Sequence, residues 1–237
     1  MHVAGLAAVE ALFATSPDRI ERLFFEPHMK GHTGQMCLEL AQAHKPYRVV
    51  GPDELEKVAG TAMHGGIVAL AHPREVLVFD TMEAEDWAKA GQPLLVLDGI
   101  GNPHNLGAIA RSAAFFGVKA VLIGEGAGNA LPSDAAFRVA EGGMEYLDFY
   151  RTRDLPRALT MMDPHYRTVA SSLGTDAMSL ADLPRDRAVA LVLGNEENGV
   201  SAPVLAACRR QVRIVGHGHG QSLNVAQAGA VFLAALA

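Results

Sequence analysis

The feature that most constrains this fold is a series of short apolar runs separated by segments long enough to form helices. In the second part of the chain these runs cover residues 94–97, 120–123, 168–170, 188–193 and 212–215. Apolar runs without alternation indicate strands that are buried on both faces, and helical connections between them indicate parallel pairing. The sequence therefore predicts an α/β fold with a mainly parallel sheet that helices cover on both faces.

The first 72 residues alternate between helical and strand-like patterns on a smaller scale. Helical patterns cover 5–14 and 36–43, a further helix is expected to begin at Pro52, and apolar strand patterns cover 23–25, 47–50 and 67–71. We therefore expect a small α/β unit over residues 1–72.

The segment 73–92 marks the expected boundary between the two parts. It carries five acidic and two basic side chains, which is half of the net charge of −6. This composition is typical of an exposed linker or a short surface helix. We therefore expect an acidic linker here and a larger domain over 93–237.

The composition narrows the class of protein. No apolar run approaches the ~20 residues of a membrane span. Cys37 and Cys208 are too few for a disulfide framework or a cysteine-based zinc site. We expect a cytoplasmic protein that does not bind membranes, and the net charge of −6 argues against a non-specific, basic nucleic-acid coat protein.

Residues 98–111 form a turn rich in glycine and asparagine between a predicted strand and a predicted helix. Such a turn directs backbone N–H groups and the positive end of the helix dipole toward an anionic ligand. The glycines at 99 and 101 fit the start of a dinucleotide fingerprint, with Glu125 as the ribose-binding acid, although His104 occupies the third glycine position. A simple turn with Asn105 as the helix N-cap explains the same residues.

Two further segments follow predicted strands. In 193–201, Glu196 places a carboxylate at the carboxyl end of a parallel strand, where open α/β sheets bind ligands, and Ser201 is expected to cap a helix. Residues 214–224 alternate glycines with two histidines, a weak metal signal without a third ligand, so no metal site is predicted. Ser222 and Asn224 are expected to cap the final helix, over 225–237.

The three segments, taken in order, contain Asn105-x-Gly107-x-x-x-Arg111, Gly194-x-Glu196-x-x-Gly199 and Ser222-Leu-Asn224-Val. Together they resemble the three signature motifs of the SpoU (TrmH) family of RNA ribose 2′-O-methyltransferases, within the SPOUT superfamily, over residues 93–237. His64-Gly-Gly66-Ile resembles the His-Gln-Gly turn of the small ribosomal-protein-like RNA-binding domain that precedes the catalytic domain in many members. The chain departs from the family in motif three, where Val215 and Gly216 replace the usual Pro and Met.

The resemblance implies a deep trefoil knot in the C-terminal domain, which periodicity alone would not predict. It also implies S-adenosylmethionine as the methyl donor, rRNA or tRNA as the partner, and a homodimer that builds each site from both subunits. By the same resemblance, the donor-binding positions are Leu193, Gly194, Ile214, Gly216, Gly218, Ser222 and Leu223. The catalytic positions are Asn105, Arg111, Glu196, Ser222 and Asn224.

Arg111 matches the essential arginine of the family. Methyl transfer from a sulfonium to a ribose hydroxyl requires that hydroxyl to lose its proton. Because a guanidinium keeps its own proton to above about pH 12, we expect Arg111 to bind the phosphate and stabilise the developing alkoxide. Asn105 would orient Arg111 or the ribose, and Glu196 would hold the polar cluster in place. Ser222 and Asn224 would position the donor and the arginine loop.

RNA binding requires positive charge in a chain that is acidic overall. Five arginines within one 30-residue stretch offer a phosphate-facing rim: Arg138, Arg151, Arg153, Arg157 and Arg167. Basic side chains of the N-terminal domain would select the RNA: His28, Lys30, His32, Lys45 and Arg48. Two alternatives stay open, a non-catalytic RNA-binding homologue, because motif three is altered, and a nicotinamide-dependent oxidoreductase, because of the 99–101 glycines and Glu125.

Overall fold

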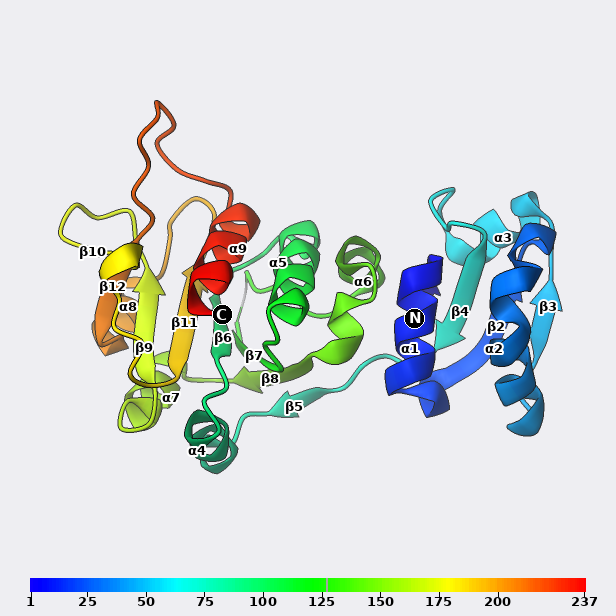
Figure 1. Cartoon of the computed structure of the whole chain (residues 1–237), viewed down its shortest axis with the longest axis horizontal. Coiled ribbons are helices and arrows are strands. Elements are labelled where there is room, and N and C mark those ends of the chain that lie inside the picture. The colour runs from blue at the N-terminus through cyan, green and yellow to red at the C-terminus, as the bar shows by residue number, and fades with distance from the viewer. Residues whose placement is uncertain (127) are drawn as a thin grey trace.

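The computed structural model describes residues 1–126 and 128–237, which form two α/β units (Figure 1). The N-terminal unit has a four-stranded sheet in the order β1-β4-β2-β3, so the small α/β unit expected from the sequence is confirmed. Its elements, in chain order, are β1 (His2–Ala4), α1 (Leu6–Thr15), η1 (Pro17–Arg19), β2 (Ile20–Phe25), η2 (Pro27–Met29), α2 (Lys30–Gln42), β3 (Tyr47–Val49), α3 (Pro52–Ala59) and β4 (Ile67–Ala71), where η denotes a 3₁₀ helix.

The two faces of this small sheet have separate cores. On one face Leu23 packs in a cluster with Leu12 of α1 and Leu40 of α2. On the other face Phe24 packs with Leu55 of α3. Neighbouring residues of a strand point to opposite faces, so β2 contributes to both cores.

The C-terminal unit has an eight-stranded sheet in the order β10-β12-β9-β11-β6-β7-β8-β5, in which every neighbouring pair is parallel. The predicted mainly parallel sheet is therefore confirmed. Its elements are β5 (Val76–Val78), α4 (Thr81–Lys89), β6 (Leu94–Asp98), α5 (Pro103–Phe115), β7 (Ala120–Gly124), α6 (Asp134–Ala140), η3 (Gly143–Tyr146), β8 (Asp148–Thr152), α7 (Leu155–Met162), β9 (Arg167–Ser171), β10 (Met178–Ser179), η4 (Leu180–Asp182), β11 (Val189–Gly194), α8 (Ala202–Ala207), β12 (Arg210–Arg213) and α9 (Val225–Leu236).

The centre of the large sheet is buried on both faces, as the uninterrupted apolar runs predict. Along β6, Leu95 and Leu97 belong to the core that α5, α6 and α9 cover, whereas Leu94 and Val96 belong to the core on the opposite face, under α4, α7 and α8. Burying each such leucine contributes about 1.5–3 kcal/mol. These strands therefore form a stable base for the loops that follow them.

The acidic segment 73–92 contains regular structure. Strand β5 pairs with β8 at one edge of the large sheet. Helix α4 is capped by the Asp80 carboxylate and buries Ala84, and the Trp87 ring lies 5.1 Å from the ring of Tyr150. Asp86, by contrast, is exposed. Acidic residues that suggested a linker, such as Asp86, therefore lie on the solvent-exposed side of a helix that packs against the sheet.

The two units contact each other through α1 and the region around η3. Glu145 on η3 accepts hydrogen bonds from Arg19, at 2.6 Å, and Arg74, at 3.3 Å. Backbones also approach closely, since a Cβ on Gly142 would lie 2.8 Å from the Ala7 carbonyl oxygen. Among the described residues, no helix has the length and apolar character to cross a membrane. The trefoil knot implied by the resemblance stays a prediction.

Candidate functional site

The loops after β6 and β11 lie together because the two strands are parallel neighbours in matched register. Leu97 pairs with Leu193, and Asp98 pairs with Gly194, so motifs one and two leave the sheet at the same edge. The Asp98 carboxylate accepts a hydrogen bond of 2.7 Å from the backbone N–H of Ser201, at the start of α8. Gly194 is required here, since a Cβ would lie 2.2 Å from the carbonyl carbon of Gly199.

Asn195 locks these two loops together. Its Nδ2 donates to the carbonyl oxygen of Gly99 at 2.8 Å, and its Oδ1 accepts from the backbone N–H groups of Glu197 and Asn198 at 3.0 Å each. The N–H of Gly99 in turn donates to Oδ1 of Asn129, at 2.8 Å. The roles of Asn195 and Asn129 were not predicted from the sequence. Each follows a glycine after a buried strand, and a Gly-Asn pair there indicates a turn but not the partner of the asparagine side chain.

The polar residues of the three motifs meet above this edge. The Nδ2 of Asn105, on α5, donates to the Glu196 carboxylate, and Nδ2 of Asn224 donates to Oδ1 of Asn105 at 3.3 Å. The Asn105 amide therefore bridges motif two and motif three. We call Asn105, Glu196 and Asn224 the polar cluster.

Helix caps differ in part from the sequence expectation. Asn105 lies in the first turn of α5, whereas Asn102 is the N-cap and accepts from the His104 N–H at 2.8 Å; the prediction of Asn105 as N-cap was wrong because Pro103 begins the helix two residues earlier. Asn224 caps α9, accepting from the Ala226 N–H at 2.8 Å, as predicted, whereas the prediction that Ser222 also caps this helix was wrong, because the residue lies two positions before the cap.

Arg111 lies apart from the polar cluster. It follows Asn105 by six residues on α5, which turns it by about 240° around the helix axis. Its Nη2 pairs with the Glu141 carboxylate at 2.8 Å, and both side chains are more than half exposed. Glu141 has a positive φ of 45°, which is rare for a residue other than glycine. Among the described residues, no hydrogen bond or ion pair joins Arg111 to the cluster.

The expected donor-binding residues fall into two groups. Leu193 and Gly194 are buried at the end of β11, whereas Gly216, Gly218, Ser222 and Leu223 are exposed on the loop between β12 and α9. Ile214, directly after β12, lines a cavity of about 510 Å³ whose walls come from η4, this loop and α9. Its other lining residues are Ser179, Leu180, Ala181, Arg185, Val215, His217 and Ala235. A mainly apolar cavity of this size is within the range of small-molecule sites.

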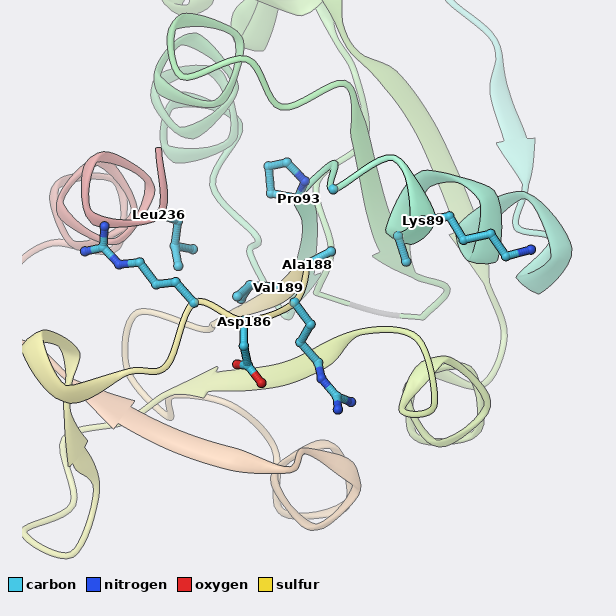
Figure 2. Close-up of a pocket in the computed structure, with 10 residues that line it drawn as sticks. Lys89, Pro93, Asp186, Ala188, Val189 and Leu236 are labelled. Atoms are coloured by element: carbon cyan, nitrogen blue, oxygen red, sulfur yellow. The ribbon is translucent and has the colours of Figure 1, made fainter.

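A second cavity, of about 430 Å³, shares Arg185 with the first and lies at the amino ends of the central strands (Figure 2). Pro93 and Val189, which line it, stand at the amino ends of β6 and β11. The side chain of Lys89 extends away from Asp186 in this view. The cavity is therefore remote from the first two motifs. In the part of the chain that the structure describes, no group of three or more His, Cys, Asp or Glu side chains is arranged to hold a metal ion.

The five arginines of the expected rim do not form one group. Arg151 lies near the carboxyl end of β8, and Arg153 and Arg157 follow it. Arg167, by contrast, is the first residue of β9, at the amino edge of the sheet, and it pairs with Asp186 at 2.5 Å. Arg138 lies on α6. The single five-arginine rim is therefore wrong, because residues 138–167 pass from one edge of the sheet to the other.

Cys208, between α8 and β12, has a thiol with a large pKa shift. Burial, together with the carboxylates of Asp98 and Asp163, raises the pKa of its thiol to about 12. The thiol is therefore protonated at neutral pH and is a poor nucleophile. Cys208 packs against the core on the face of the sheet that α4, α7 and α8 cover.

Two family descriptions match this geometry. Residues 92–234 match the SpoU rRNA methylase family, and residues 2–77 match the substrate-binding domain of RNA 2′-O ribose methyltransferases. The chain belongs to the SpoU methylase family. The predicted family, α/β fold and enzyme class are thereby confirmed, and the oxidoreductase interpretation is not supported. Glu125 of that interpretation pairs instead with Arg151 and Arg153.

Named relatives cover almost the whole of this SpoU methylase. The 23S rRNA (guanosine-2′-O-)-methyltransferase RlmB of Acinetobacter baylyi is 31% identical, over 97% of this chain and 93% of its own length. The enzyme of the same name from Bordetella pertussis is 33% identical, over 98% of this chain and 94% of its own length.

Solved structures share the fold at lower identity. AviRb, a SpoU methyltransferase from Streptomyces viridochromogenes solved in complex with the cofactor AdoMet, aligns with a TM-score of 0.79 over 100% of this chain and 88% of its own, at 19% identity. A structure described as an RNA 2′-O ribose methyltransferase aligns with a TM-score of 0.76 over 100% of this chain and 87% of its own, at 24% identity. These alignments extend over both α/β units.

Proposed function

We propose that this SpoU methylase transfers a methyl group from S-adenosylmethionine to the ribose 2′-hydroxyl of a guanosine in 23S rRNA. The observation that carries the proposal is the polar cluster, in which Asn105, Glu196 and Asn224 from the three motifs are hydrogen-bonded at the carboxyl edge of the sheet. The choice of 23S rRNA follows the printed names of relatives that match both units over nearly their whole length.

The residues present suit a sulfonium donor bound through backbone groups. Gly194 has no side chain to obstruct the end of β11, and Ile214 lines the apolar cavity of about 510 Å³. We assign donor binding to the loops at 193–194, 214–218 and 222–223. When bound, the donor would supply an electrophilic methyl group: its S–CH₃ bond would break as the O–CH₃ bond forms, S-adenosylhomocysteine would leave, and the hydroxyl proton would pass to water.

The chain's own residues hold the acceptor ribose and its phosphate. Since the Asn105 amide has its nitrogen toward Glu196 and its oxygen toward Asn224, its orientation is fixed before substrate binds. Preorganised polar groups of this kind stabilise charge that develops in the transition state. A guanidinium offers N–H donors and no acceptor, so the part of Arg111 is to bind phosphate and to stabilise the developing alkoxide.

We further propose that the enzyme is a homodimer in which Arg111 acts at the site of the second copy. Arg111 is on a different side of α5 from Asn105, and one turn further along the same exposed stripe Phe115 is 82% exposed. Helix α9 packs beside α5 on the same face of the sheet and exposes Val231 (Figure 1). An exposed apolar surface beside a functional arginine suits a second copy of this chain.

The activity is tested with labelled S-adenosylmethionine and protein-free 23S rRNA, with bulk tRNA as the competing substrate. We expect ribose methylation of a guanosine in the rRNA that is lost in Asn105→Ala and Glu196→Gln. Methylation of tRNA alone would replace the proposed substrate, and full activity of both variants would reject the site.

Mixed dimers test the shared site. Arg111→Ala and Asn105→Ala, each of which we expect to be nearly inactive alone, are unfolded and refolded together. If the site is shared, half of the dimers are mixed and one of their two sites is intact, which restores about one quarter of the wild-type activity. No recovery in mixed dimers would place Arg111 and Asn105 in the same subunit's site.

A further inference from the structure

Three arginines of this enzyme stand at the same edge of the sheet as the polar cluster. Strand β8 is parallel to β7, and Arg151 pairs with Ile123, which pairs with Leu97 on β6. Arg151 therefore reaches the level at which motif one leaves the sheet. Arg153 follows directly, and Arg157 lies in the first turn of α7.

Contacts of the segment after β7 connect the end of β8 to motif one. The loop after β7 contacts motif one, where Asn129 accepts from the Gly99 N–H at 2.8 Å. The same loop contacts β8, where the Glu125 N–H donates to the Thr152 carbonyl at 2.7 Å. Two strand spacings of about 4.8 Å separate β8 from β6, about 10 Å in all. Neighbouring nucleotides of a single strand span that distance.

The charge of this edge is only partly neutralised. Glu125 alone pairs with two arginines, with Arg151 Nη1 at 3.4 Å and with Arg153 Nε at 3.3 Å. The side chains of Arg151 and Arg153 are 49% and 92% exposed, so their remaining N–H groups face solvent. Asp154, the other acid here, accepts from the backbone N–H of Arg157 at 2.9 Å and caps α7. Arg157 is exposed as well.

We propose that Arg151, Arg153 and Arg157, the β8 rim, bind phosphates of the nucleotides that flank the methylated ribose. Guanidinium groups recognise phosphate through paired hydrogen bonds, and Glu125 orders two of them without cancelling their charge. The inference rests on the proposed function for its substrate, and it adds a second RNA contact, in the catalytic domain, to that of the N-terminal domain. The chain as a whole carries a charge of −6, so a local rim of this kind is where the RNA backbone would be held.

The test measures RNA binding and catalysis in the full-length protein. The variants are Arg153→Glu with Arg157→Glu, and separately Arg151→Gln. The matched control is Arg187→Glu, an exposed arginine at the amino edge of the sheet. Fluorescence anisotropy with a labelled single-stranded rRNA fragment, without donor, gives the affinity at several salt concentrations. Methyl transfer gives KM for RNA and kcat, and calorimetry with S-adenosylhomocysteine tests the donor site.

For the double variant we expect the Kd and KM for RNA to rise at least tenfold, and the affinity for S-adenosylhomocysteine to stay unchanged. The slope of log affinity against log salt should fall by about 1.4, as expected when two arginines no longer neutralise phosphates of a single strand. The control should match the wild type. An unchanged Kd and salt slope in both rim variants would overturn the inference while leaving the proposed function in place. If no RNA is methylated, the proposed function fails, and the anisotropy measurement still decides whether the rim binds RNA.

Discussion

Replacing Glu145 by alanine should destabilise the contact between the two α/β units. The Glu145 side chain is fully buried, and its Oε2 accepts from Arg19 and Arg74, whose side chains are only 16% and 13% exposed. Glu145→Ala therefore leaves two nearly buried guanidinium groups without their shared counter-charge. Removing one partner of a buried ion pair costs about 3–5 kcal/mol.

The remaining contacts place the expected loss at the lower end of that range. Arg74 keeps its pair with Asp148 at 3.0 Å, and Arg19 keeps its hydrogen bonds to the His72 carbonyl oxygen at 3.1 and 3.2 Å. We therefore expect a loss of about 3 kcal/mol, which for a chain of this length corresponds to a fall in Tm of roughly 6–12 °C. Differential scanning calorimetry measures the Tm, and scans at several rates establish that the comparison is at equilibrium.

Asp148→Asn provides the matched control, because it weakens the exposed end of the same network. The Asp148 side chain is 59% exposed, and exposed ion pairs contribute about 0–1 kcal/mol. We expect the control to melt within about 4 °C of the wild type. A Tm for Glu145→Ala equal to that of the control would refute the reasoning, since it would mean that burial adds nothing to this pair.

Three further outcomes follow from the site. Asn105→Ala removes the amide that bridges Glu196 and Asn224, so kcat should fall about a hundredfold with donor affinity unchanged, and an unchanged kcat would count against the cluster. Gly194→Ala forces a Cβ to within 2.2 Å of backbone, so thermal melting should show a loss of at least ~1–3 kcal/mol, and an unaltered Tm would contradict it. With a pKa of about 12, Cys208 should react with iodoacetamide at pH 8 about a thousandfold more slowly than a free thiol, and mass spectrometry showing rapid labelling would disprove the burial.

The sequence predicts the buried centre of the large sheet well and its edges poorly. Strands β6, β7 and β11 are apolar on both faces, so their residues form uninterrupted runs. Strand β8, next to the edge, reads Asp-Phe-Tyr-Arg-Thr, and the edge strand β5 has three residues inside an acidic segment. Pairing at an edge requires little apolar character, so tertiary contacts decide it. For this reason the sequence predicted a linker over 73–92 and did not predict β5.

The polar cluster could be predicted from the sequence because its three residues lie at the ends of predicted strands or the starts of predicted helices. Glu196 follows a central strand, Asn105 lies in the first turn of the helix after its parallel neighbour, and Asn224 caps the last helix. Parallel strands bring such positions to one edge. The roles of Asn195 and Asn129 are different, since both bind backbone groups of another loop, and no sequence pattern records such contacts. Only the folded chain places them.

Motif one carries two positions proposed to act in catalysis, Asn105 and Arg111, which a single helix does not direct to one point. A separation of six residues along α5 turns Arg111 about 240° from Asn105 and moves it about 9 Å along the axis. A flexible loop could bring both to the same ribose, but Ile109 and Ala110, which lie between them, are buried in the core and fix the helix in place. If both positions serve one reaction, the arginine must therefore reach a site other than that of its own Asn105. The two-subunit site proposed above would then be a consequence of helix geometry, and the exposed Phe115 on the arginine's side of the helix is what a second copy would cover.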